Sequence, residues 1–366
     1  MKIGEDKVKV SLIGYGYVGK TFHAPLIKAV PGLELVAVSS RHPDVVRADW
    51  PEVEVVADPK EAATFAEAEL VVIASPNETH FPLAEAALLA GKHVVVDKPF
   101  TIDLAEARSL QETARRQGRV LSVFHNRRWD GDFLAAQALI ANGSLGEVLH
   151  FESHIDRFRP EVRQRWREQA VPGGGIWYDL GPHLIDQALV LFGLPEKVSG
   201  HLAQQRPGAQ TDDWAHVLLD YGQLKVVLHA SMMVAHSGPR YTIHGTGGTW
   251  IKTGMDVQEG QLVQGMVPGA EGWGVDSKPG LFYNGVDPDP KKLGVPPGDY
   301  RQFYVRMKAA IREGQPNPVP PGQAIAVMAV IETALASARS GQALEVALTD
   351  EERTAYAESR ASLVGS

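Results

Sequence analysis

Over the first 124 residues, short and uniformly apolar runs alternate with longer segments whose apolar side chains recur at helical spacing. Apolar runs without alternation indicate strands that are buried on both faces, as in a parallel sheet, and the segments between them fit crossover helices. We predict strands over residues 8–13, 33–38, 53–57, 70–74, 93–96 and 119–124, and helices over 18–30, 82–90 and 104–117. This pattern predicts a doubly wound, Rossmann-type α/β domain over residues 1–124.

The pattern changes in the remaining residues, 125–366. Longer and partly alternating runs, separated by turn residues such as Tyr221-Gly222, are typical of an open, mainly antiparallel sheet with one covered face. We predict strands over 147–158, 198–205, 214–221, 224–234 and 240–252, helices over 133–141, 176–191, 300–314 and 324–340, and a surface excursion over 254–298. Residues 125–366 are therefore expected to form an α+β domain for substrate binding and oligomerisation.

The composition excludes several classes of protein. The 366 residues include 36 Lys and Arg against 44 Asp and Glu, a net charge of −8, which argues against a nucleic-acid partner. The absence of cysteine excludes disulfides, thiolate metal centres and a cysteine nucleophile. No apolar run reaches the roughly 20 residues of a membrane helix, and the amino terminus is charged, so we expect a cytoplasmic protein with no membrane partner.

A glycine-rich motif directly follows the first predicted strand. The residues Gly14-Tyr15-Gly16-Tyr17-Val18-Gly19 form a G-x-G-x-x-G pattern that opens the first helix. Such glycines allow a tight turn and let backbone amides approach a pyrophosphate, although a turn chosen for packing alone would use the same residues. The context of repeated strand–helix units favours dinucleotide binding.

The end of the second predicted strand bears on the choice of cofactor. An NAD enzyme usually has Asp or Glu about 20 residues beyond the glycine motif, whereas this chain has Ser39-Ser40-Arg41. A guanidinium with two hydroxyls suits the 2′-phosphate of NADP, because arginine forms charge-assisted hydrogen bonds to phosphate. We therefore predict NADP as cofactor, with NAD as a weaker alternative; otherwise Arg41 is only a solvated loop charge.

Two further strand ends carry polar residues. The fourth strand ends in Ser75-Pro76-Asn77, with His80 one turn later, and the fifth ends in Asp97-Lys98-Pro99. Ligands bind at the carboxyl ends of the strands in such folds. The expected cofactor-binding residues are Gly14, Tyr15, Gly16, Tyr17, Val18, Gly19, Ser39, Ser40, Arg41, Ser75, Pro76, Asn77, His80, Asp97 and Lys98.

A histidine and two aspartates follow a glycine run in the second domain. Asp179, His183 and Asp186 have helical spacing after Gly173-Gly174-Gly175, and they share a face if this stretch is helical throughout. Pro182 offers the alternative that the helix begins there. A His–Asp pair fits general acid–base catalysis but also occurs as a structural pair. The glycines favour the first interpretation, because they let the chain pass close to a ligand.

Taken together, these motifs resemble the glucose–fructose oxidoreductase / inositol dehydrogenase / rhizopine catabolism (Gfo/Idh/MocA) family. The resemblance rests on Gly14-x-Gly16-x-x-Gly19, Ser75-Pro76-Asn77-x-x-His80, Asp97-Lys98-Pro99 and Gly173-Gly174-x-x-x-x-Asp179-x-Gly181-x-His183, with Asp97 where the family commonly has Glu. It implies a Rossmann domain, a second domain with an open antiparallel sheet, and a hydride transfer on sugars or polyols. By resemblance the catalytic residues are Lys98, which would orient the substrate, Asp179, and His183, which would carry the proton.

Two shorter segments, Thr21-Phe22-His23-Ala24-Pro25-Leu26 and His125-Asn126-Arg127-Arg128-Trp129-Asp130, resemble a subgroup that includes NADP-dependent scyllo-inositol dehydrogenases. We expect a cyclic polyol or sugar as substrate, because a site that bonds several hydroxyls discriminates against analogues without them. The expected substrate-binding residues are Lys98, Asn126, Arg127, Asp156, Arg163, Trp166, Tyr178, Asp179 and His183.

Most of the arginines between 157 and 167 are expected to form a solvated charged segment with Glu161 and Glu168. His150 and His154 can share a strand face, but the sequence suggests no third ligand, so we expect no metal site. Apolar residues in both phases of the strands over 214–221 and 224–234 predict a homodimer or homotetramer.

Two other functions remain open at this point. One is a glycosidase that oxidises and re-reduces its sugar on the same cofactor without net redox change, as some members of the family do. The other is a dinucleotide sensor that has lost the chemistry, although Lys98, Asp179 and His183 are all present.

Overall fold

The computed structural model describes residues 7–364, which form two compact units. Unit 1 comprises the residues up to Asn126 together with Gln258–Trp273 and Asp299–Ile325, and unit 2 comprises Arg127–Val257, Gly274–Gly298 and the residues from Ala326 onward. The first change of unit falls two residues from the expected boundary at 124. The return of two later segments to unit 1 has no signature in the sequence pattern.

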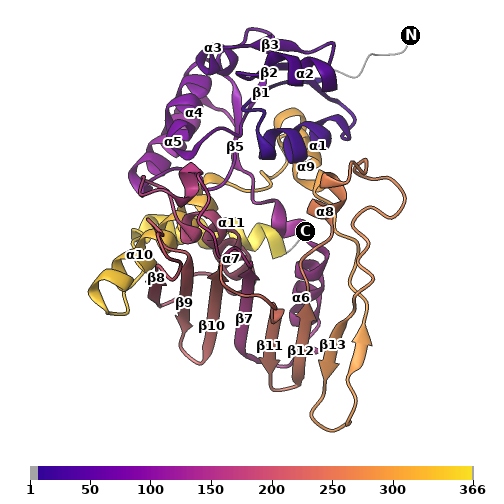
Figure 1. Cartoon of the computed structure of the whole chain (residues 1–366), viewed down its shortest axis with the longest axis vertical. Coiled ribbons are helices and arrows are strands. Elements are labelled where there is room, and N and C mark those ends of the chain that lie inside the picture. The colour runs from indigo at the N-terminus through magenta and orange to yellow at the C-terminus, as the bar shows by residue number, and fades with distance from the viewer. Residues whose placement is uncertain (1–6, 365–366) are drawn as a thin grey trace. The chain divides into compact units, whose positions relative to one another are not determined.

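Unit 1 is built on a six-stranded parallel sheet with the order β3-β2-β1-β4-β5-β6 (Figure 1). This is the Rossmann order, in which the direction of strand addition across the sheet reverses between β1 and β4. The strands are β1 (Val8–Ile13), β2 (Leu33–Ser39), β3 (Glu54–Val56), β4 (Leu70–Ile73), β5 (His93–Val96) and β6 (Leu121–Val123). Their apolar side chains are buried on both faces, which explains the lack of alternation in the sequence.

Helices cover both faces of this sheet. In Figure 1, α4 and α5 lie on one side, and α1 and α9 lie on the other. The helical segments of unit 1 are a π-helical turn (Gly19–His23), α1 (Ala24–Lys28), α2 (Pro43–Asp49), α3 (Pro59–Ala63), a 3₁₀ turn (Asn77–Thr79), α4 (His80–Leu89), α5 (Leu104–Gln117), α8 (Gln258–Val263) and α9 (Arg301–Glu313). The predicted doubly wound domain is confirmed.

Unit 2 contains an eight-stranded sheet with the order β14-β13-β12-β11-β7-β10-β9-β8. Its strands are β7 (Val148–Asp156), β8 (Lys197–Ala203), β9 (Trp214–Tyr221), β10 (Leu224–Ser231), β11 (Pro239–Gly245), β12 (Gly248–Thr253), β13 (Gly280–Tyr283) and β14 (Lys291–Leu293). Every neighbouring pair is antiparallel except β7 and β10, which run parallel. The expected open and mainly antiparallel sheet is confirmed.

Two details of this prediction were wrong. The segment 240–252 is not one strand but the hairpin of β11 and β12, because Gly245 and Gly247 turn the chain against the backbone of Leu145. The segment 254–298 is not only a surface excursion, since it contains α8, β13 and β14. Gly280 lets β13 pack against the ring of Trp250 on β12, where any larger residue would clash.

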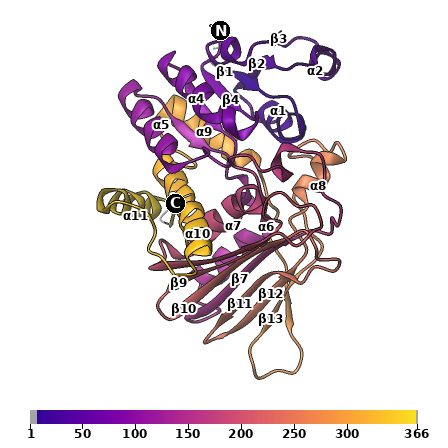
Figure 2. The same cartoon turned by 60° about the vertical axis from the view of Figure 1, so that its left-hand side comes forward.

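The two faces of this sheet differ in what covers them. Figure 2 shows α7 (Ile176–Phe192) and α10 (Pro321–Ser340) over one face. Phe151, Ser153 and Ile155 of β7 are buried on that side, and Arg240 links Ser153 to Gln187 of α7. The alternate residues of β7, among them Glu152, His154 and Asp156, point to the opposite side, which we call the open face.

Three further helices complete unit 2: α6 (Gly131–Ala141), α11 (Asp350–Val364) and a 3₁₀ turn (Trp166–Glu168); another 3₁₀ turn (Asn126–Trp129) lies at the change of unit. By length and composition α10 could cross a membrane, but two thirds of its apolar window is buried, as in the core helix of a globular domain. The apolar pattern predicts only the part of this helix from residue 324 onward.

Helix α7 continues through Pro182, so the alternative start at that residue was wrong. Asp179, His183 and Asp186 therefore lie on one helix, as expected. Asp186 is buried and accepts two hydrogen bonds from Arg128, at 2.9 Å from Nε and 2.6 Å from Nη2. This bidentate pair ties α7 to the segment before α6, so Asp186 has a structural role.

We predict that Asp186→Ala lowers the free energy of unfolding by about 3–5 kcal/mol, because it leaves the buried Arg128 guanidinium without its counter-charge. Urea denaturation measures the change. As a control, Glu112→Gln removes an exposed pair with Arg115 at 2.9 Å, and we expect no measurable change. Equal effects of the two substitutions would contradict the structural role of Asp186.

Candidate functional site

The glycine motif lies at the carboxyl end of β1, beside β4, where the strand order reverses. Gly14 has a φ of +96°, and a Cβ on it would stand 2.6 Å from the carbonyl oxygen of Ala74. A Cβ on Gly19 would collide with the carbonyl oxygen of Gly14. Both glycines are therefore required by the packing of the protein itself, as the alternative interpretation of the motif holds.

Gly16 differs from its two neighbours in the motif. A Cβ on Gly16 would meet nothing within 4 Å, and the residue has no positive φ that would demand glycine. The described fold therefore does not explain this glycine. A pyrophosphate bound there would explain it, because the missing side chain would let the backbone approach the ligand closely at the start of a helix.

The two tyrosines of the motif point toward other partners. The Tyr15 hydroxyl donates to Asp49 at 2.8 Å and accepts from the indole of Trp50 at 2.8 Å. Tyr17 is exposed and donates to Glu259 of α8 at 3.0 Å. Their side chains thus position α2 and α8 around the motif, while Val18 lies in the helical start that follows Gly16.

The loop after β2 contains a cation with no fixed partner. The Ser39 carbonyl accepts from Gly14 N–H at 3.1 Å, which joins this loop to the glycine motif. The Ser40 hydroxyl accepts from His42 N–H at 3.0 Å. Arg41 is exposed, and no ion pair or hydrogen bond holds its guanidinium among residues 7–364. The charge is therefore available to an anionic ligand at this strand end.

His80 joins the ends of β4 and β5. Its Nε2 is 3.0 Å from the carbonyl oxygen of Ser75, and its Nδ1 is 2.8 Å from that of Pro99, which follows a cis peptide bond. Burial lowers the pKa of His80, so the ring is neutral near pH 7 and can donate from only one nitrogen at a time. Its contacts make it a clamp between the loop of Ser75, Pro76 and the buried Asn77 and the loop after β5.

Asp97 lies in a buried polar chain. Its Oδ1 is 3.9 Å from His23 Nε2, and His23 Nδ1 is 2.6 Å from the Tyr304 hydroxyl of α9. Burial alone would raise the pKa of Asp97, but His23 and Lys98 outweigh it and hold the pKa below its usual value. The carboxylate is thus an anion beside the half-buried Lys98 at the tip of β5.

In unit 2, the glycine run shapes the start of α7. Asp212 accepts from Trp177 N–H at 2.8 Å, and the Asp212 carbonyl accepts from Ile176 N–H at 2.8 Å. A Cβ on Gly175, whose φ is +102°, would collide with the Asp212 carboxylate. These glycines were predicted to let the chain pass close to a ligand, whereas this cap explains Gly175. The cap itself has no local pattern in the sequence.

Asp179 is held by two arginines. Arg157 Nη1 lies 3.5 Å from its Oδ2, and Arg167 Nε lies 3.5 Å from its Oδ1. These two arginines are exceptions to the solvated segment expected for most of the arginines here, because both are partly buried against Asp179. His183 follows one turn later on α7 and is buried. The helix therefore presents a carboxylate and an imidazole on one face.

The other residues predicted to bind the substrate do not share one environment. Arg127 is buried with Asp130, 3.4 Å away, and Asn126 is buried at the change of unit. Trp166 packs under the guanidinium of Arg167, Tyr178 is half-buried on α7, and Arg163 is exposed. Asp156 is not brought together with Asp179, because it points to the open face of the sheet beside His154 and His229.

Comparisons with known proteins cover nearly the whole chain. A family model described as an oxidoreductase family NAD-binding Rossmann fold matches residues 8–125, and one described as the C-terminal alpha/beta domain of an oxidoreductase family matches residues 137–348.

Three related proteins illustrate the match. The oxidoreductase YdgJ of Escherichia coli is 52% identical over 336 residues, covering 91% of this chain and 97% of that protein. IolW of Bacillus subtilis, a scyllo-inositol 2-dehydrogenase (NADP(+)), is 38% identical over 340 residues, covering 91% and 94%. The crystal structure of an oxidoreductase from Klebsiella pneumoniae superposes with a TM-score of 0.91 at 51% identity, covering 97% and 99%.

We predict that Gly16→Ala leaves the melting temperature unchanged but weakens dinucleotide binding by roughly tenfold or more, about 1.4 kcal/mol. The added methyl group meets no protein atom and would occupy the approach to the pyrophosphate. Gly260→Ala is the matched control, since its Cβ also meets nothing within 4 Å in the same unit. Cofactor titration by fluorescence measures both variants, and unchanged affinity in Gly16→Ala would place the pyrophosphate elsewhere.

Proposed function

The chain belongs to the Gfo/Idh/MocA family of NAD(P)-binding oxidoreductases, and on that premise we propose that it is a dehydrogenase that transfers a hydride between NADP and a hydroxyl or keto carbon of a cyclic polyol or sugar. The observation that carries the choice of NADP is the exposed Arg41 after β2, which has no counter-ion among the described residues. The name of IolW, an NADP-dependent inositol dehydrogenase, supports both the cofactor and the substrate class.

Several residues of unit 1 would hold the cofactor. Backbone amides at Gly14 and Gly16 would face the pyrophosphate, and Ser39, Ser40 and Arg41 would bind the phosphate on the adenosine ribose. His80 would act through the loops that it fixes, rather than by direct contact. When bound, the nicotinamide accepts or returns the hydride.

Three residues are proposed for the reaction itself. Lys98 Nζ would orient the substrate oxygen and stabilise negative charge on it. His183 would take the hydroxyl proton during oxidation and return it during reduction. Arg157 and Arg167 hold the Asp179 carboxylate in place. Asp179 would in turn orient the reacting groups beside the face of α7 that it shares with His183. Asn126, Arg127, Arg163, Trp166 and Tyr178 are proposed to bind the remaining hydroxyls and the ring.

We predict that Arg41→Ala raises the KM for NADP by roughly tenfold or more and leaves the KM for NAD nearly unchanged. A charge-assisted hydrogen bond contributes about 1.5–3 kcal/mol, and NAD has no phosphate to receive it. Arg47→Ala on α2 is the control, because Arg47 is an exposed arginine six residues from Arg41 in the sequence and pairs with Asp44. Equal weakening of both cofactors by Arg41→Ala would show that Arg41 does not select NADP.

We predict that His183→Ala reduces turnover and removes the fall in the oxidation rate at low pH. An imidazole base works only when neutral, so protonation of the ring at low pH should slow oxidation by the wild type. The profile of kcat against pH measures this, with cofactor affinity as the test of folding. An unchanged profile in the variant would assign the proton transfer to another group.

A further inference from the structure

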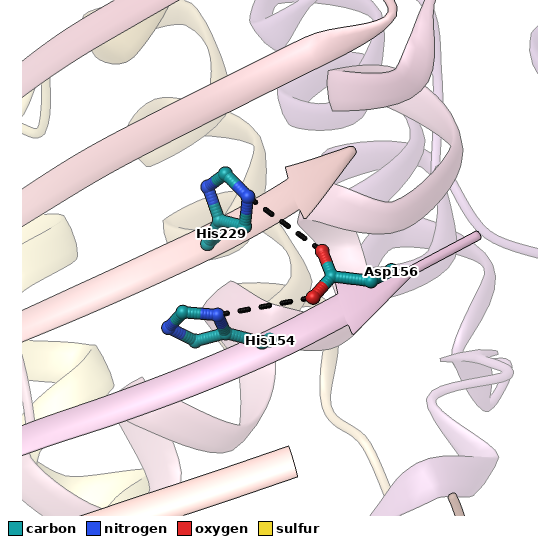
Figure 3. Close-up of side chains that lie close together, drawn as sticks. All are labelled: His154, Asp156 and His229. Atoms are coloured by element: carbon teal, nitrogen blue, oxygen red, sulfur yellow. Dashed lines mark ion pairs between the residues drawn. The ribbon is translucent and has the colours of Figure 1, made fainter. Parts of the chain in front are cut away.

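Three potential metal ligands meet on the open face of the sheet in unit 2. His154 and Asp156 are two residues apart on β7, and His229 lies opposite His154 on the parallel neighbour β10. Figure 3 shows each ring facing a different oxygen of the Asp156 carboxylate. His229 Nε2 is 3.6 Å from Asp156 Oδ1, and His154 Nδ1 is 4.0 Å from Asp156 Oδ2.

The spacing of these atoms is close to that of a metal site. The three ligand atoms all lie within 4.8 Å of one another. Zn²⁺ binds histidine nitrogen and carboxylate oxygen at about 2.0–2.2 Å, so tetrahedral ligand atoms are roughly 3.3 Å apart. Small side-chain rotations would therefore bring all three groups onto one ion, and rigid neighbouring strands hold them in register.

In each ring, the nitrogen that points away from Asp156, here called the outer nitrogen, already has a partner. His154 Nε2 is 3.1 Å from Glu152 Oε2, and His229 Nδ1 is 3.3 Å from His216 Nδ1. If each outer nitrogen carries the ring proton and donates it, His154 Nδ1 and His229 Nε2 keep their lone pairs toward Asp156. Metal-binding histidines have this arrangement, in which an outer acceptor fixes the tautomer and the ring orientation.

The charges around the cluster also suit a cation. The Asp156 side chain is only about 5% exposed beside the two rings, and the Glu152 carboxylate lies one contact further out, beside His154. Asp156 and Glu152 together would balance the two positive charges of Zn²⁺.

We propose that His154, Asp156 and His229 form a site for a divalent transition metal, with Zn²⁺ as the fitting ion and one coordination position open to water. The sequence alone predicts no metal site, since it suggests no third ligand for His150 and His154. His150 in fact pairs with Glu152 at 2.8 Å and stays outside the cluster. The missing ligands were Asp156 on the same strand and His229, which only the β7–β10 pairing brings close.

The test is a zinc titration of the full-length chain, freed of any histidine tag and treated with a chelator. We expect calorimetry to give one Zn²⁺ per chain, and His229→Ala to weaken that binding by at least roughly 100-fold. His244→Ala is the matched control, because His244 is an exposed histidine on the same face and bonds to Thr249 instead. We expect this variant to bind zinc as the wild type does.

Two further variants keep the test decisive. His154→Ala should repeat the loss seen for His229→Ala, and Glu152→Gln should weaken zinc binding by roughly tenfold, since it alters only the outer partner of His154. Melting curves without metal verify that each variant is folded. The proposal is overturned if the wild type binds no stoichiometric zinc, or if folded variants lacking His154 or His229 bind it as tightly as the wild type.

Discussion

Backbone packing at the carboxyl end of β1 is the constraint on which the proposed function depends. Gly14 touches Ala74 of the neighbouring strand end, and Gly19 touches Gly14, so neither position accepts a side chain. These contacts hold the first helical turn against the sheet and leave Gly16 facing open space. Because β2 and β4 flank β1, Ser39–Arg41 and Ser75–Asn77 are brought to the same edge. The proposed cofactor site thus follows from the strand order.

In unit 2, the parallel pairing of β7 and β10 is the constraint that positions the polar groups. Side chains alternate along β7, so Ser153 points toward α7, whereas Glu152 and His154, on either side of it in the sequence, point toward the open face. The sheet thereby separates two sets of polar groups. Asp179 and His183 belong to α7 on one side, while the cluster of His154, Asp156 and His229 belongs to the other. One strand therefore contributes to two distinct chemical environments.

The sequence predicted the regular parts of the fold well. The strands 93–96 and 214–221 and the helix 104–117 match to the residue, because each has a clear apolar pattern between strong turn residues. The pattern missed α11, α2 and α3, whose apolar residues are few. It also joined β11 to β12, since apolar residues continue on both sides of the turn.

Site residues close in sequence were easier to predict than contacts that depend on tertiary structure. The glycine motif and the spacing of Asp179 and His183 are local, and α7 bears out that spacing. The arginines around Asp179, the Asp212 cap and the link from His23 to Asp97 join distant segments, so no local pattern reveals them. The expected homodimer or homotetramer and the roles of the individual site residues stay predictions.

The most direct test of the proposed function follows reduced-nicotinamide absorbance while the purified chain is given a panel of inositols and sugars with NADP or with NAD. We predict that at least one cyclic polyol or sugar is oxidised, with kcat/KM for NADP exceeding that for NAD by roughly tenfold or more. No net reduction of cofactor with any member of the panel would contradict the proposed reaction, and a preference for NAD would contradict the role given to Arg41.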